Sequence, residues 1–220
     1  MAKTITIKKT VMGYKGELDY LFDDTDGKRL AILLPGVGYN NDMPLLYYSS
    51  KIFSSKGYSI FKVNYRYQGN DEFNNSSLQE IRKWIRADVI ASTETLFKES
   101  KFEEIVLVCK SVGTIAGLES LKTIKELRTA RIIWQTPLTH MDEIVNDLNE
   151  IENESLILIG TNDQCYVKEN IDLIGAKKNY KNIIIPDADH RLEVSDDIQQ
   201  SIKIIETITR EISNFIDTGR

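Results

Sequence analysis

The sequence predicts an α/β domain with a mostly parallel central sheet that is covered by helices on both faces. Short apolar runs alternate with amphipathic helical stretches through the whole chain, which is the pattern of such folds. Several of these runs are continuous rather than alternating, as expected for strands buried on both faces. A chain of 220 residues fits one α/β unit, and no repeat or linker divides it. We therefore expect one domain over residues 1–220.

Eight segments are expected to form strands. The first two are joined through Gly13 and predict an N-terminal antiparallel hairpin. The later ones, beginning with the run LAILL, are rich in Ile, Leu and Val and predict the parallel part of the sheet. The expected strands are at 4–12, 17–22, 30–34, 59–65, 105–109, 131–135, 155–160 and 182–185.

The expected helices follow from end signals and apolar spacing. Asp42 is an N-cap candidate with Pro44 in the first turn of a helix that ends at Gly57. The capping box Ser77-x-x-Glu80 opens a long helix. Further helices are expected from about 112, over roughly 141–150, and from about 195. In the last one, a single face is expected to hold Ile198, Ile202, Ile205, Ile208, Ile212 and Phe215.

Composition narrows the class of protein. The formal net charge is −5 and no basic run is long enough to form a patch, so nucleic acid and anionic membrane surfaces are poor partners. The N-terminus, MAKTITIKK, has no apolar signal region. The two cysteines, Cys109 and Cys165, lack metal-binding spacing and are typical of reduced thiols. We expect a cytoplasmic protein without a metal or another cofactor.

A candidate nucleophile follows the strand 105–109, at the strand end where open α/β sheets bind ligands. Ser111 lies in a tight strand-to-helix turn and is flanked two residues away by Cys109 and Gly113. Small flanking residues are needed because this turn packs against its neighbours, and the pattern is that of a nucleophile elbow. Cysteine in place of the first glycine departs from the motif. The alternative is that Ser111 only caps the following helix.

An acid and a base follow two later strands. Asp163 comes just after the strand 155–160, and His190 lies in the loop before the last helix. The order Ser, Asp, His suits acyl transfer, because imidazole takes the seryl proton and a carboxylate fixes its tautomer. Alternatively, Asp163 caps a helix near Tyr166, and the acid is one of the residues of the histidine's own loop, Asp187, Asp189 or Glu193. The other histidine, His140, is expected to be a solvated loop residue.

A glycine-rich turn, Pro35 to Tyr39, follows the strand 30–34. Such a turn can direct a backbone N–H group at a developing oxyanion, and Val37 is the candidate donor. The second donor would be the N–H of Val112, which follows the nucleophile. We expect the remaining residues of the turn, Gly36, Gly38 and Tyr39, to contact the substrate.

Four segments together resemble the α/β-hydrolase superfamily over about residues 20–217: LLPGVG, VCKSVG, IGTNDQ and DADHRLE. The region from Leu156 onward resembles the compact dienelactone-hydrolase-like and small carboxylesterase branches. The resemblance implies an α/β-hydrolase fold without a large cap, since only about a dozen residues follow the strand 131–135 before the next loop. It also implies a serine hydrolase that acts on a small-molecule acyl substrate.

Two other functions remain open from the sequence. One is a small-molecule binding protein that keeps the fold without strong catalysis, which the substitution at Cys109 keeps in consideration. The other is a peptidase of the same fold. We expect an open, shallow site bordered by Tyr39, the loop 66–77 and Trp134. Lys110 is expected to be solvated at its rim, with contact to a substrate carboxylate as the alternative.

Overall fold

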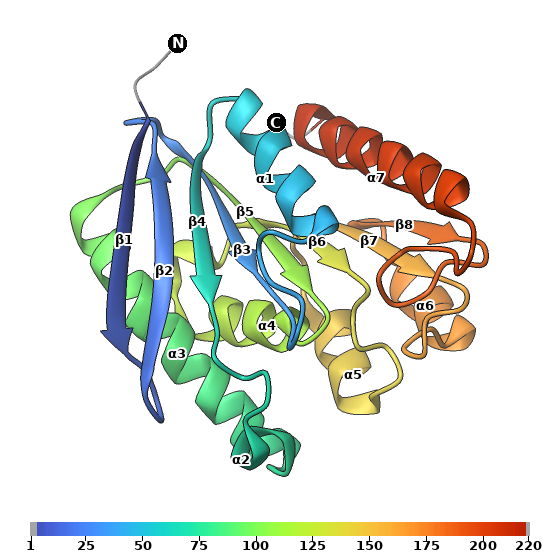
Figure 1. The fold of residues 1–220 in the computed structure, drawn as a ribbon, viewed down its shortest axis with the longest axis horizontal. Coiled ribbons are helices and arrows are strands. Elements are labelled where there is room, and N and C mark those ends of the chain that lie inside the picture. The colour runs from blue at the N-terminus through green and yellow to red at the C-terminus, as the bar shows by residue number, and fades with distance from the viewer. Residues whose placement is uncertain (1–3, 219–220) are drawn as a thin grey trace.

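The computed structural model describes residues 4–218, so the first three and last two residues of the expected domain, with the start of the N-terminal segment, lie outside it. One sheet of eight strands runs through the described chain in the order β1-β2-β4-β3-β5-β6-β7-β8 (Figure 1). Each expected strand is present, with small differences at the ends. The strands are β1 (Ile5–Met12), β2 (Glu17–Asp24), β3 (Arg29–Leu34), β4 (Ser59–Asn64), β5 (Glu104–Lys110), β6 (Arg131–Gln135), β7 (Ser155–Gly160) and β8 (Tyr180–Ile185).

The pairing of the strands matches the prediction of a mostly parallel sheet. β1 pairs with β2 in antiparallel orientation, and β2 pairs with β4 in the same way. All pairs from β4 to β8 are parallel. The apolar runs of these central strands are buried on both sides, which explains why their sequences do not alternate between apolar and polar residues.

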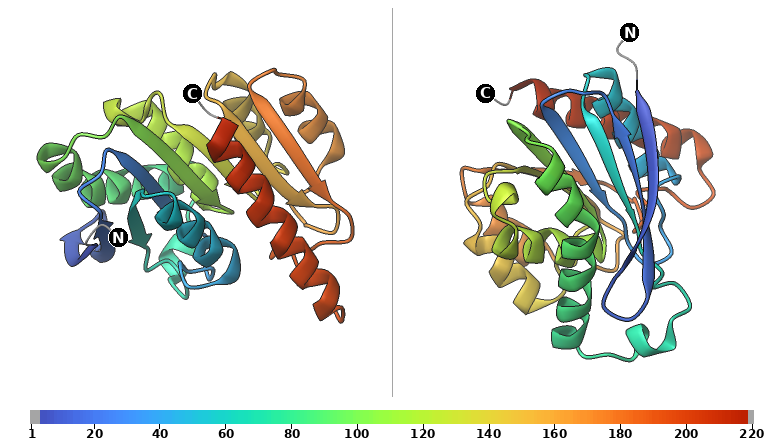
Figure 2. Two further views of the ribbon diagram at one scale, coloured as in Figure 1. Left: turned by 90° about the horizontal axis from the view of Figure 1, so that it is seen from above. Right: turned by 90° about the vertical axis from the view of Figure 1, so that its left-hand side faces the viewer.

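Helices cover both faces of the sheet and form two separate cores. α1 and α7 lie together on one face, and α3 to α6 lie on the other (Figures 1 and 2). Because each face is covered, the parallel strands need no polar side. The helices are α1 (Pro44–Ser55), α2 (Asp71–Asn74), α3 (Leu78–Glu99), α4 (Gly113–Thr123), α5 (Asp142–Glu150), α6 (Lys168–Gly175) and α7 (Ile198–Thr218), with a short 3-10 helix at Lys125–Leu127.

The register of the parallel strands brings the functional loops together. Leu34, the last residue of β3, pairs with Cys109 of β5. Lys110 of β5 pairs with Gln135, the last residue of β6. The carboxyl ends of these strands therefore meet at one edge of the sheet, and the loops that follow them lie side by side. Between β6 and β7 the only helix is α5, so this described segment holds no cap domain.

Of the two predicted helix N-caps, one is confirmed and one is wrong. Ser77 caps α3, since its side chain accepts a hydrogen bond from the N–H of Glu80. The prediction for Asp42 was wrong: the N-cap of α1 is Met43, which makes no side-chain cap. Instead, the hydroxyl of Tyr39 accepts a hydrogen bond from the N–H of Leu45 in the first turn. A residue from the preceding turn thus supplies the cap that the local sequence lacks.

The prediction of one apolar face on the last helix was partly wrong. Ile208, Ile212 and Phe215 are buried as expected. Ile198 and Ile202, however, are 70% and 56% exposed. The helix starts at Ile198 rather than at Ser195, and its buried stripe begins at Ser201 and Ile204, so Ile198 and Ile202 lie outside the core.

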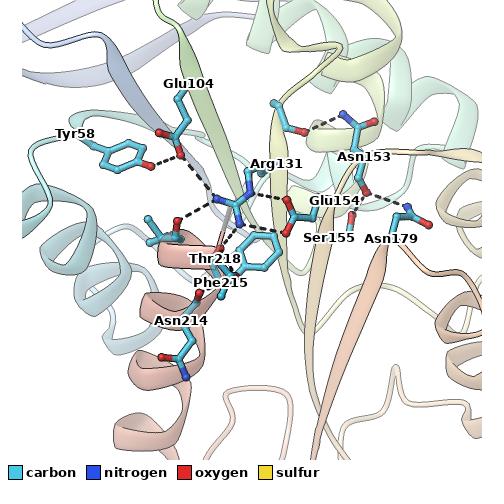
Figure 3. Close-up of polar contacts among 12 residues, drawn as sticks. Tyr58, Glu104, Arg131, Asn153, Glu154, Ser155, Asn179, Asn214, Phe215 and Thr218 are labelled. Atoms are coloured by element: carbon cyan, nitrogen blue, oxygen red, sulfur yellow. Dashed lines mark hydrogen bonds and ion pairs between the residues drawn. The ribbon is translucent and has the colours of Figure 1, made fainter. Parts of the chain in front are cut away.

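A buried arginine binds the last turn of α7, and Figure 3 shows its contacts with Glu154 and Phe215. Arg131, the first residue of β6, pairs with Glu154 and donates hydrogen bonds to the backbone carbonyls of Phe215 and Ile216. These carbonyls belong to the last turn of α7, where backbone acceptors lack helical partners. Among residues 4–218, no helix is long and apolar enough to cross a membrane.

Candidate active site

Ser111 occupies a strained turn between β5 and α4. Its φ angle is 54°, in the left-handed region that residues with a Cβ atom rarely adopt. The turn is tight on its far side as well, because a Cβ atom added to Gly113 would lie 2.0 Å from the carbonyl oxygen of Leu34. The alternative of a capping serine is not what the structure shows: the N-cap of α4 is Val112, without a side-chain cap. This conformation presents the Ser111 side chain at the sheet edge.

The structure brings Ser111, His190 and Asp163 together. His190 Nε2 lies 2.8 Å from Ser111 Oγ, and His190 Nδ1 lies 2.8 Å from Asp163 Oδ1. The Asp163 side chain is buried, and its Oδ1 also accepts a hydrogen bond from the N–H of Cys165. α6 begins at Lys168 with Val167 as its N-cap, so Asp163 does not cap that helix. The carboxylate is instead within hydrogen-bond distance of the imidazole.

The acids of the histidine loop do not contact the imidazole ring. Asp189 Oδ1 accepts hydrogen bonds from the N–H groups of Arg191 and Glu193, so it shapes the loop that carries His190. Asp187 is exposed and has a φ angle of 61°. The other histidine, His140, is exposed in the loop after β6, as expected. Of the four candidate acids, the structure therefore pairs only Asp163 with His190.

The glycine-rich turn after β3 lies directly against the serine. A Cβ atom on Gly36 would be 3.0 Å from Ser111 Cβ and 3.2 Å from the carbonyl oxygen of Lys110, so a larger residue would push these neighbours apart. In the described chain, the N–H groups of Val37 and Val112 donate to no protein acceptor. Free backbone amide donors of this kind are what an oxyanion hole requires.

A small cavity of about 90 Å³ lies beside this turn. Its walls are the residues 35–40 on one side, which include Gly36, Gly38 and Tyr39, and the loop after β4 with Tyr65 and Tyr67 on the other. The prediction that Trp134 borders the site was wrong. Its ring is wholly buried, and its Nε1 donates to Ser155 Oγ, because Ile132 and Trp134 of β6 face the core under α3 to α6.

Lys110 was expected to be solvated, and this prediction was wrong. Its side chain is wholly buried, and Nζ donates to Thr136 Oγ1 at 2.5 Å and to the backbone oxygen of His190 at 2.9 Å. Burial lowers the pKa of the ammonium to about 8, while the charge of Asp163 opposes this shift. One sequence feature indicates this burial: the lysine directly follows the apolar, buried run IVLVC.

The two thiols are buried. Burial raises the pKa of Cys109 well above its usual value, and burial together with the nearby Asp163 raises that of Cys165 to about 12. Asp163, Cys165 and His190 offer potential metal ligands within 4.8 Å of one another. They suit a metal poorly, because the aspartate and histidine already bond each other and the cysteine stays a protonated thiol.

Comparisons with known proteins place this arrangement in a known fold. An esterase from Pyrococcus furiosus superposes with a TM-score of 0.74 at 13% identity, over 97% of this chain and 92% of that one. A serine hydrolase without a lid from Xanthomonas campestris gives a TM-score of 0.70 at 15% identity, over 97% and 96% of the two chains. The fold is that of the α/β hydrolases.

A third structural relative of this α/β-hydrolase fold is Est1E from Butyrivibrio proteoclasticus, whose structure holds ferulic acid. It gives a TM-score of 0.69 at 14% identity and covers 94% of this chain and 98% of its own. No family model and no curated protein matches the sequence. At these identities the likeness establishes the fold, and the chemistry has to be derived from the residues themselves.

Proposed function

We propose that this protein is a serine hydrolase that cleaves small ester or thioester bonds through an acyl-enzyme intermediate. The observation that carries the proposal is the contact of His190 Nε2 with Ser111 Oγ at 2.8 Å, on a serine held at a φ angle of 54°. A serine that only stabilises the fold has no need of strained backbone or of an imidazole partner. The combination is what an activated nucleophile needs.

The proposed reaction has two steps. Ser111 Oγ attacks the acyl carbonyl as its proton passes to His190, and the N–H groups of Val37 and Val112 stabilise the oxyanion. The protonated imidazole then gives this proton to the leaving alcohol or thiol as the acyl bond to that group breaks. In the second step, water loses a proton to His190 and attacks the acyl-enzyme, and the imidazole returns this proton to Ser111 Oγ as the acyl bond breaks and the carboxylic acid leaves. Asp163 orients the ring and stabilises its charge throughout.

The cavity supports a preference for short acyl groups. The cavity of about 90 Å³ is lined by Gly36 and Val37, the turn that approaches Ser111, and by none of the three candidate catalytic residues. An acetyl to butyryl chain fits that space, whereas a longer chain would extend over an open surface and gain little binding energy there. The absence of a cap between β6 and β7 in the described chain also supports a preference for short acyl groups.

The test is turnover of a panel of acyl esters, thioesters and peptides by the purified protein and by Ser111→Ala. The proposal predicts hydrolysis of short esters or thioesters by the wild type and none by the variant. A peptidase of the same fold would cleave the peptides faster than the esters. A binding protein that keeps the fold would turn over nothing, and the same small esters would then bind without release of product.

A further inference from the structure

We propose that Lys110 is a positioning residue of the active site, whose buried ammonium group holds the His190 loop in line with Ser111. The inference rests on the proposed function and extends it to a residue that does not touch the substrate. Lys110 is adjacent to the nucleophile in sequence, yet its side chain leaves the strand end toward the interior, where it is wholly buried. It therefore acts through the loops that it contacts.

The ammonium group connects three loops that follow different strands. It donates to the backbone oxygen of His190 after β8 and to the hydroxyl of Thr136 after β6. It also lies 4.8 Å from the centre of the Tyr39 ring, in the turn after β3. Since Lys110 itself ends β5, one side chain links the nucleophile strand, the histidine loop and the candidate oxyanion turn.

The bond to His190 bears directly on the reaction. The carbonyl that accepts it belongs to the residue whose ring must point at Ser111 Oγ. Other bonds hold the loop at Asp189 and, from residues 161–162, at Asp187 and Ala188, but none of these reaches the backbone of His190. A loop free to shift by a fraction of an ångström would misalign Nε2. Proton transfer depends on such alignment, and a misplacement of about 1 Å can cost about 100-fold in rate.

The charge of Lys110 also affects Asp163, the partner of His190. Asp163 Oδ2 is buried and has no hydrogen-bond partner among residues 4–218. The attraction between this carboxylate and the ammonium of Lys110 offsets part of the cost of burying both charges. The other charged or titratable groups that act on the lysine are Cys165, Asp189 and Arg191. Of these, Arg191 alone repels it.

Stability alone does not explain a lysine here. An ammonium taken out of water costs several kcal/mol, and an apolar residue of similar volume is often neutral or stabilising at such a position. Lys110→Met keeps the length of the side chain and removes both the charge and the donors. If the lysine positions the histidine, this variant loses rate while it keeps its fold.

The experiment compares Lys110→Met with Lys177→Met. Lys177 is the control, because its ammonium also bonds to neighbouring loops, in this case to the backbone oxygens of Asn149 and Ile151 at the opposite end of the sheet. We expect kcat of Lys110→Met to fall by about 10- to 100-fold, with KM changed by less than about twofold. We expect kcat of Lys177→Met to stay within about twofold of the wild type, even where its melting temperature falls.

A wild-type kcat in folded Lys110→Met, or a change confined to KM, would overturn the inference. If that variant does not fold, Thr136→Val provides the same comparison, since it removes one acceptor of the ammonium and keeps the shape of the side chain. A lower kcat at unchanged KM in this variant supports the positioning role, and a wild-type kcat overturns it.

A measurement that needs no turnover separates this inference from the proposed function. The Nδ1 proton that His190 shares with Asp163 gives a downfield proton NMR signal when the ring is held rigidly. We expect it in the wild type and expect it to broaden or vanish in Lys110→Met, whereas an unchanged signal would overturn the positioning role. If the wild type shows the signal but hydrolyses no ester, the proposed function fails. The comparison of this signal between the wild type and Lys110→Met still tests whether Lys110 positions His190.

Discussion

A Cβ atom added to Gly117 would lie 2.6 Å from Cys109 Sγ, so the glycine of α4 leaves the room that the cysteine of β5 occupies. In the elbow motif the residue two positions before the serine is glycine. Here that position holds the larger Cys109, and a glycine at position 117 provides the space for it. Trp134 closes the same space, at 2.9 Å from the added atom. The departure from the elbow motif is thus compensated one helical turn into α4, and the strained turn at Ser111 is retained.

This relationship predicts that Gly117→Ala destabilises the fold. The added methyl meets Cys109 Sγ and the Trp134 ring in a fully buried region, and overpacking of this kind typically costs about 1–3 kcal/mol. Denaturant unfolding measures the loss. In the double variant with Cys109→Gly, we expect the cost to be smaller than the sum of the single costs by about 0.5–3 kcal/mol. Simple additivity would show that the two residues do not share the space.

Asp163→Asn is expected to lower kcat by about four orders of magnitude, because an amide favours the wrong imidazole tautomer. Asp187→Asn and Asp189→Asn are the matched controls, since both lie in the histidine loop and neither side chain contacts the ring. Steady-state kinetics with a short ester distinguishes them. Near-normal turnover in Asp163→Asn, with a deep loss in one of the controls, would move the acid role into the loop.

Substrate size gives a further prediction. The cavity of about 90 Å³ and the short segment between β6 and β7 predict the highest kcat/KM for acetyl to butyryl esters. They also predict no jump in rate when a substrate forms micelles, since no cap is available to open. Initial rates over a series of acyl chain lengths test both points. A rate that climbs steadily toward palmitoyl esters would contradict this reading of the site.

The buried lysine predicts a dependence of stability on pH. Its pKa is about 8 in the folded protein and has the ordinary value of 10.5 in the unfolded chain. Between these values the unfolded chain binds more protons, so the free energy of unfolding rises with pH through this window, by at most about 1.4 kcal/mol per pH unit. Urea unfolding of the wild type and of Lys110→Met should be measured from pH 7 to 10.5. The free energy of unfolding of the wild type should rise relative to that of the variant as the pH increases. A constant difference would mean that the lysine titrates normally.

The sequence predicted the sheet and the three candidate catalytic residues because both depend on local patterns. Continuous apolar runs marked the strands, and residues directly after a strand end must lie at the sheet edge. Lys110 and Trp134 were misplaced because the face on which a strand-end side chain lies depends on neighbouring strands and loops, such as the one that carries Thr136. The role of Gly117 could not be predicted for the same reason, because its partner Cys109 lies in another element.

The prediction for α7 failed at its first turn for a related reason. Helical spacing groups Ile198 and Ile202 with Ile208 and Ile212, but the packing of the helix on the sheet leaves the first two exposed. At the other end of the helix, Arg131 donates to the carbonyls of the last turn. A contact between β6 and the end of the chain leaves no local pattern in the sequence.

The proposal that Ser111 is an activated nucleophile has a control within the chain. Ser77 is a capping serine with no imidazole partner. We expect Ser77→Ala to lose about 1 kcal/mol of stability and to keep full activity. Ser111→Ala should instead keep its fold and lose turnover. The opposite pattern, with activity retained in Ser111→Ala, would reduce Ser111 to a structural residue.

The most direct test of the account is labelling with a fluorophosphonate, which reacts only with an activated serine, followed by mass spectrometry to find the modified residue. We expect one label per chain at Ser111, formed at the wild-type rate in Ser77→Ala and absent in Ser111→Ala. We also expect it to form far more slowly when His190 is replaced by Ala, because the imidazole activates the serine. An unlabelled wild type, or full labelling of Ser111→Ala, would contradict the assignment of Ser111 as the nucleophile.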